Sequence, residues 1–258
     1  VDNRGGASGV IGIEIVARAP GDGYTLLVFS PSLWTLPLIQ RTTYDTLRDF
    51  APVTLAVTAP NLLLVHPSFP ATSVKGLIAL AKAKPGEYNY AAGSIGAASH
   101  LSGELFKSMA GVNIVRVPFR GTGPGLNAVI GGQVQMMFAG AGTAVPQVLA
   151  GRLRALAVTS AQPSVLFPDL PTIASSGLPG YELETNTAMF APVATPSAVL
   201  NRLQAEISHA LHAPEVKQKL AAAGMEPVAN TPAELAAKVK AEIARLGKVV
   251  KEAGIRAD

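Results

Sequence analysis

Strand-like and helix-like runs alternate along residues 61–159, and this alternation constrains the fold more than any other feature of the sequence. Runs rich in β-branched and large apolar residues predict strands, whereas amphipathic runs that end at Gly predict helices. Because strands that alternate with short helices are typical of βαβ units, we expect an α/β fold with a mostly parallel sheet. The predicted strands are Tyr24–Ser30, Asn61–His66, Tyr88–Ala92, Asn113–Phe119, Val134–Phe138 and Leu153–Thr159, and the predicted helices are residues 10–19, Val74–Lys84, Ser99–Ala110, Pro124–Ile130 and Ala144–Ala150.

The alternation ends after Ser160. Four prolines predict a loop-rich passage over residues 161–180, and an extended segment follows over Glu182–Ala191. Helical spacing then continues almost to the end of the chain, over Ala198–Leu211, Pro214–Ala223 and Pro232–Ala253.

Composition shifts at residues 60–72 and 182–196 predict two crossings between two lobes. We therefore expect a discontinuous first lobe of residues 1–66 and 188–258 and a second lobe of residues 67–187. A two-strand hinge would join them, with a ligand cleft between the lobes. The alternative is a helical cap, formed by the C-terminal helices, on a single sheet.

Composition excludes several classes of function. The absence of Cys excludes disulfides, Cys-ligated zinc, iron–sulfur clusters and thiol catalysis. No apolar run approaches the roughly 20 residues of a membrane span, and the polar start at residues 1–4 is unlike a signal peptide. The net charge of +4 raises the question of a nucleic-acid partner. None is expected, because no basic stripe is interleaved with aromatic residues, and the balanced charges of residues 201–258 predict solvated helix faces.

Three Gly-rich turns, at residues 5–9, 93–96 and 121–125, each lead into a predicted helix. A helix N-terminus offers unpaired N–H groups to an anion, and Gly lets the anion approach the backbone. A tight strand-to-helix turn is the alternative for each of them. Residues 89–150 contain only four charged side chains, those of Glu104, Lys107, Arg116 and Arg120, so we expect a small-anion site that avoids acids.

Catalytic and metal-binding motifs match poorly. No P-loop is present. Residues 92–96 do not match the nucleophile elbow fully, because Ala92 stands in place of its first Gly. An α/β hydrolase that uses Ser94 remains the alternative. His100 and Glu104 have the spacing of two metal ligands on a helix, but without a third ligand we expect a pair on the helix surface. His100 could instead donate to a bound carboxylate, and Trp34 could either pack in the core or form a cleft wall.

Several motifs in order along the chain carry a resemblance to a known family. They are Asp2-Asn3-Arg4, Asp22-Gly23-Tyr24-Thr25-Leu26-Leu27, Asp49-Phe50-Ala51-Pro52-Val53-Thr54, Ser99-His100-Leu101-Ser102-Gly103-Glu104-Leu105-Phe106, Val117-Pro118-Phe119-Arg120-Gly121, Leu153-Arg154-Ala155-Leu156-Ala157-Val158-Thr159, Pro168-Asp169-Leu170-Pro171-Thr172 and Gly177-Leu178-Pro179-Gly180-Tyr181. Over essentially its whole length, the chain resembles the Bug (TctC) family of substrate-binding proteins of tripartite tricarboxylate transporters.

The resemblance implies a monomeric periplasmic binding protein of the type II, two-lobe α/β architecture, without catalysis, cofactor or metal. Its ligand would be a small carboxylate, and its partners the two membrane components of a tripartite transporter. A module that presents its ligand to a signalling sensor is the alternative. Carried over by position, the ligand contacts would be Ser30, Ser32, Ser94, Gly96, Ala97, Ala98, Ser99, His100, Arg120, Gly121 and Thr122.

The chain departs from the family pattern in two places. Family members usually carry an Asp after the strand that ends here at Phe138, whereas this chain has Ala139-Gly140-Ala141-Gly142, which argues against an amino-acid ligand. Family members also begin with a strand, a ligand loop and a helix ahead of Asp2-Asn3-Arg4, so an N-terminal βα unit is expected to be missing here.

Overall fold

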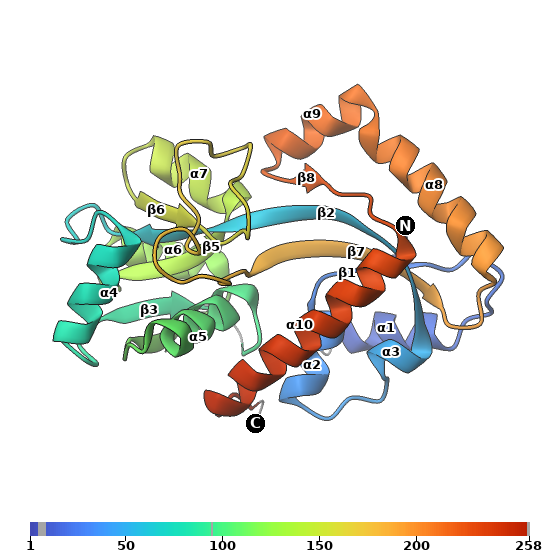
Figure 1. The fold of residues 1–258 in the computed structure, drawn as a ribbon, viewed down its shortest axis with the longest axis horizontal. Helices are drawn as coiled ribbons and strands as arrows, with labels where there is room; N and C mark the ends of the chain where they lie inside the picture. Colours follow the sequence, from blue (N-terminus) through green and yellow to red (C-terminus); the bar gives the residue numbers. More distant parts are fainter. Residues whose placement is uncertain (5–8, 94, 257–258) are drawn as a thin grey trace.

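The computed structural model describes residues 1–4, 9–93 and 95–256. Two groups of elements are joined by two long strands, β2 (Phe50–Val65) and β7 (Glu184–Pro192) (Figure 1). The two strands pair antiparallel from Phe50↔Pro192 to Pro60↔Glu184. Beyond Pro60, β2 leaves β7 and pairs with strands of the second group.

The first group contains the N-terminal elements and the C-terminal helices. Strands β1 (Leu27–Phe29) and β8 (Glu226–Pro227) pair with β7 and β2, respectively. A core built around Trp34, Phe50 and Phe190 holds these strands and helices together. The helices of this group are α1 (Val10–Ala17), α2 (Ser32–Ile39), α3 (Thr46–Asp49), α8 (Ser197–His212), α9 (Pro214–Ala222) and α10 (Pro232–Glu252).

The second group is a sheet with the order β2-β5-β3-β4 and β6 on β2, covered by helices on both faces. Side chains alternate along β3, so Tyr90 and Ala92 pack toward α4 and α5, whereas Ala91 packs toward α6 and α7. The strands are β3 (Asn89–Ala92), β4 (Val115–Pro118), β5 (Met136–Gly140) and β6 (Arg154–Val158), and the helices are α4 (Val74–Ala83), α5 (Ala98–Ala110), α6 (Thr122–Ile130) and α7 (Ala141–Leu149).

The expectation of a mostly parallel sheet is wrong. Among the strands in the described ranges, only β3–β4 and β3–β5 pair parallel, and every pairing of β2 is antiparallel. The local βαβ units of residues 89–140 are therefore as expected. The long strand β2, which enters from the first group against the direction of β5, gives the sheet its mixed character.

Strand β2 begins at Phe50, whereas the predicted strand begins at Asn61, and two prolines account for the difference. Pro52 lies at a shift in the β2–β7 register, and Pro60 lies where β2 parts from β7. Both positions tolerate a residue without an N–H group. The predictions also missed α2, which contains Pro37, and the short elements α3 and β8.

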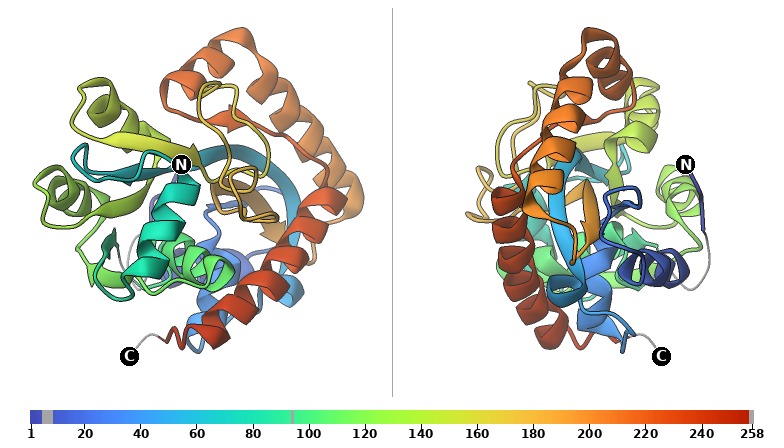
Figure 2. Two further views of the ribbon diagram at one scale, coloured as in Figure 1. Left: turned by 60° about the vertical axis from the view of Figure 1, so that its left-hand side comes forward. Right: turned by 90° about the vertical axis from the view of Figure 1, so that its right-hand side faces the viewer.

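Helix α10 packs against both groups. Leu235 and Val239, near its start, lie in the core of the first group. Leu246, Val249 and Val250, near its end, lie in the core of the second group. In the side view of Figure 2, α10 and α1 lie on either side of β2 and β7. The lobe boundaries at residues 66/67 and 187/188 stay a prediction, and α10 adds a third connection to the two strands.

Candidate functional site

The carboxyl ends of the parallel strands β3, β4 and β5 lie at one edge of the second sheet. The pairing of Asn61 with Gly140 places the end of β5 beside the point where β2 enters from the first group. Helices α5, α6 and α7 each follow one of these strands, α7 directly and the other two after a loop, so their N-termini also lie at this edge. This is the edge at which open α/β sheets bind ligands.

The three helices begin without side-chain caps. Their N-cap residues are Ala97, Gly121 and Gly140, and none of them accepts a hydrogen bond through its side chain. The first amides of a helix have no partner within the helix and carry the positive end of its dipole. The edge therefore presents backbone donors that suit an anion.

A cavity of about 280 Å³ opens between α2, α5, β7 and α10. Five of the predicted ligand contacts line it, namely Ser30, Ser32, Gly96, Ala97 and Ala98. Thr35, Glu184, Thr185, Glu242 and Arg245 line it as well, and none of these was predicted.

This cavity does not avoid acids, contrary to expectation. Glu184 lies on the hinge strand β7, where burial raises the pKa of its carboxyl group. Glu242 lies on α10, far along the chain from the Gly-rich loops. Both acids lie outside residues 89–150, and nothing in the sequence places α10 beside α5.

Gly96 brings the loop before α5 against the first group. Its φ is +77°, a conformation that favours Gly. A Cβ atom at this position would lie 2.6 Å from the Cδ1 atom of Ile39 in α2. The loop before α5 therefore packs directly against a helix of the first group.

The side chains of Ser99 and His100 both bind the loop that precedes α5. The Oγ atom of Ser99 accepts a hydrogen bond from Gly93 N at 3.0 Å, and Nδ1 of His100 accepts one from Gly96 N at 3.1 Å. Burial and the nearby Arg116 guanidinium lower the pKa of His100 to about 4. The ring is therefore neutral at pH 7, with its hydrogen on Nε2.

The expected surface pair of His100 and Glu104 is wrong, because both side chains are buried. Glu104 accepts hydrogen bonds from the Tyr90 hydroxyl at 2.6 Å and from Lys107 at 2.8 Å. Within the described part of the chain, no three His, Cys, Asp or Glu side chains are placed to hold a metal ion. The acid is thus a partner for Tyr90 and Lys107 inside the second core.

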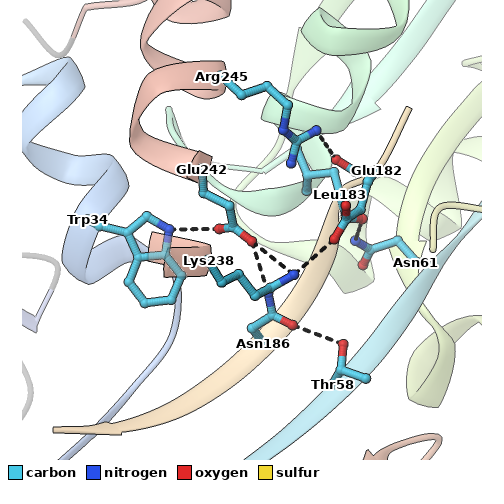
Figure 3. A network of polar contacts seen from close by, with 9 residues as sticks. All are labelled: Trp34, Thr58, Asn61, Glu182, Leu183, Asn186, Lys238, Glu242 and Arg245. Carbon is cyan, nitrogen blue, oxygen red and sulfur yellow. Dashed lines mark hydrogen bonds and ion pairs between the residues drawn. The ribbon is translucent and has the colours of Figure 1, made fainter. Parts of the chain in front are cut away.

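Trp34 packs in the first core and anchors a polar network at the hinge (Figure 3). Its Nε1 donates to Glu242 at 2.7 Å, and Lys238 lies 3.4 Å from the same carboxylate. Burial disfavours the charge on Lys238, but the hydrogen bond to Glu182 and the neighbouring Glu242 raise its pKa overall. Glu242 is only 7% exposed, so the expectation of a solvated face is wrong at this position.

The same network holds both hinge strands. Asn186 of β7 donates to Glu242 at 3.4 Å and accepts from Thr58 of β2 at 2.9 Å. Arg245 of α10 donates to the backbone carbonyl of Glu182, just before β7. Side chains of α2 and α10 are thereby tied to the strands that cross between the two groups.

The remaining predicted contacts lie apart from this cavity. Arg120 and Gly121 are exposed and Thr122 is half-buried at the start of α6, at the same sheet edge as α5. Ser94 lies outside the described residues, as do residues 5–8 of the first Gly-rich turn. In the described ranges, no histidine hydrogen-bonds to a carboxylate, so the relay that a serine hydrolase needs has no counterpart there.

No helix within the described residues has the length and apolar character that a membrane crossing requires.

Comparisons with known proteins converge on one family. Residues 1–255 match the family model described as "Tripartite tricarboxylate transporter family receptor" (TctC). The UPF0065 protein in the tcbD-tcbE intergenic region of Pseudomonas sp. (strain P51) is 37% identical over 260 residues, covering 100% of this chain and 77% of that protein.

Two solved structures are similar over nearly the whole chain. R. palustris Rpa4515 with adipate is 40% identical, with a TM-score of 0.82, covering 99% of this chain and 86% of that one. MatC (Rpa3494) from Rhodopseudomonas palustris with bound malate is 32% identical, with a TM-score of 0.74, covering 95% and 85%.

Proposed function

We propose that this chain, which belongs to the TctC family of tripartite tricarboxylate transporter receptors, binds a small carboxylate between its two lobes and delivers it to the membrane components of such a transporter. The protein would function in the periplasm, where the receptors of this family bind their ligands. The role is capture and release without chemical conversion of the ligand.

The observation that carries the proposal is the uncapped N-terminus of α5, where Ala97 and Ala98 line the 280 Å³ cavity. The amides of Ala98 and Ser99, in the first turn of α5, would donate to one carboxylate group of the ligand. Ser99 accepts a hydrogen bond from Gly93 and keeps its own hydroxyl hydrogen for a further acceptor. Ser30 and Ser32 would contribute hydroxyl groups from the first lobe.

Contacts from both lobes explain how such a ligand would act on the conformation. A carboxylate held by α5 and by the serines before α2 gains its full set of hydrogen bonds only when the lobes are together. The ligand would therefore favour the closed state by its difference in affinity for the two states. The structures of relatives with adipate and with malate support a dicarboxylate as the first ligand to test.

A thermal-shift screen of mono-, di- and tricarboxylates tests the proposal. A ligand at 100 times its Kd should stabilise the folded chain by about 2.7 kcal/mol. Absence of stabilisation by any carboxylate would refute the proposed function.

Substitutions at Ala98 test the position of the site. Ala98→Asp places a carboxylate at the first position of α5, where it favours the helix but repels an anionic ligand. Ala98→Asn has the same shape without the charge and is the matched control. We expect the Asp variant to fold normally and lose ligand binding while the Asn variant retains it; equal binding by the two variants would contradict the placement.

A further inference from the structure

Three of the four charged side chains in residues 89–150 gather on one side of the loop that precedes α5. Glu104, Lys107 and Arg116 line a second cavity of about 230 Å³ together with His100. Gly96, Ala97 and Ala98 of the same loop and helix line the first cavity instead. The loop therefore lies between the first cavity and a second cluster of charged side chains.

The side chains behind the loop bind its backbone. Arg116 donates from Nη2 to the carbonyl of Gly93 at 2.9 Å, and Ser99 accepts from Gly93 N at 3.0 Å. His100 accepts from Gly96 N at 3.1 Å. These bonds restrict Gly93 and Gly96 to one conformation, whereas unheld glycines can adopt many.

Arg116 also supports the role of His100. Its guanidinium disfavours a positive charge on the neighbouring imidazole, and Lys107 acts in the same direction, while Glu104 opposes them. A neutral ring with its hydrogen on Nε2 leaves Nδ1 able to accept from Gly96. His100 is only 4% exposed, so this ring has little contact with solvent.

We propose that His100 and Arg116 are positioning residues, which fix Gly96 and Gly93 so that the first amides of α5 face the ligand, rather than groups that touch the ligand themselves. This inference rests on the proposed function. It differs from the prediction by family resemblance, in which His100 is a ligand contact, and it adds Arg116, which was not predicted to take part.

Two substitutions of His100 separate positioning from direct contact. In His100→Asn, the side-chain oxygen stands about where Nδ1 stands and accepts from Gly96, but the donor at Nε2 is lost. In His100→Leu, the volume is largely kept and the acceptor is lost. Arg116→Met removes the donor to Gly93 in the same way. His209→Leu and Arg152→Met, at exposed positions away from both cavities, are the matched controls.

The measurements are the Kd for adipate and the hydrogen-exchange rate of the Gly96 amide without ligand. We expect His100→Leu and Arg116→Met to weaken adipate binding about tenfold, the size of one lost hydrogen bond. His100→Asn should stay within about threefold of the wild type. The Gly96 amide should exchange faster in His100→Leu and at the wild-type rate in His100→Asn.

Equal loss of binding in His100→Asn and His100→Leu would overturn the proposal, because it would assign the contact to Nε2. Unchanged Gly96 exchange in His100→Leu would also overturn it. A wild-type chain that binds no carboxylate would refute the proposed function, but the Gly96 exchange rates would still decide whether His100 holds the loop.

Discussion

Replacing Glu242 tests the claim that the polar network at the hinge holds α2, α10 and the hinge strands together. Its carboxylate accepts from Trp34 at 2.7 Å and from Asn186 at 3.4 Å, and it pairs with Lys238 at 3.4 Å. Glu242→Leu removes the acceptor of Trp34 and Asn186 and one of the two carboxylates that face Lys238, which keeps Glu182. Glu242→Gln keeps an acceptor for Trp34 but loses the charge that faces Lys238.

The expected magnitude follows from the burial of these groups. Unit charges 3.4 Å apart attract by about 5 kcal/mol at an effective dielectric constant of about 20. Desolvation offsets much of this, and Lys238 keeps its ion pair with Glu182 at 2.9 Å, so most of the loss comes from the buried Trp34 and Asn186 donors, which each cost about 1–3 kcal/mol when left unpaired. We therefore expect Glu242→Leu to lower the free energy of unfolding by about 3–5 kcal/mol, and Glu242→Gln by about 1–2 kcal/mol.

Equilibrium unfolding in urea measures these changes. Trp34 is the only tryptophan of the chain, so its fluorescence reports the network directly, and far-UV circular dichroism follows the helices. The double variant Glu242→Leu/Lys238→Met should be less destabilised than the sum of its single variants, by about 1–3 kcal/mol. A loss below about 1 kcal/mol in Glu242→Leu, or strict additivity in the double variant, would refute the reasoning.

Four further predictions concern separate features of the fold. Gly132→Ala, which has φ +68° and open space, should cost about 1–2 kcal/mol, whereas Gly96→Ala should cost clearly more because its Cβ meets Ile39; equal losses in urea unfolding would contradict the contact. His100 has a folded pKa of about 4, below its unfolded value near 6.5, so the unfolded chain takes up the proton first and stability falls as pH drops from about 6.5 to 4. His100→Asn should remove about 3 kcal/mol of that pH dependence, and an unchanged profile in urea unfolding would argue against a buried neutral ring. Thr231→Ala removes the capping box of α10 and should lower the free energy of unfolding in urea by about 1 kcal/mol. An unchanged free energy of unfolding would contradict this prediction. Leu246→Ala should lower the free energy of unfolding in urea by about 2–5 kcal/mol and speed hydrogen exchange in α5. Faster exchange in the first group alone would contradict the packing of α10 against both groups.

Local signals in the sequence predicted the elements of the second group well. Ser73 caps α4 through Gly76 N at 3.1 Å, and Gly111 ends α5 with φ +62°. These features depend only on neighbouring residues, so spacing and turn chemistry reveal them. The start of β2 was not predicted, because Pro disfavours strands by its local preference. Only the pairing of β2 with β7 shows that position 52 tolerates a proline.

The candidate site was predictable in part for the same reason. The Gly-rich loop before α5 is visible in the sequence, and Gly96, Ala97 and Ala98 line the cavity. Glu242 was missed because its partner Trp34 lies 208 positions away, and a charged residue on an amphipathic helix gives no sign that it is buried. The family resemblance predicted His100 as a site residue, but only the structure shows that its Nδ1 accepts a hydrogen bond from Gly96.

A crystal structure of the chain grown with adipate tests the central claim most directly. We predict a ligand carboxylate at the cavity between α2 and α5, with an oxygen within hydrogen-bond distance of the backbone amide of Ala98 or Ser99. A cavity without adipate at a saturating concentration, or adipate bound through side chains at another place on the chain, would contradict the account.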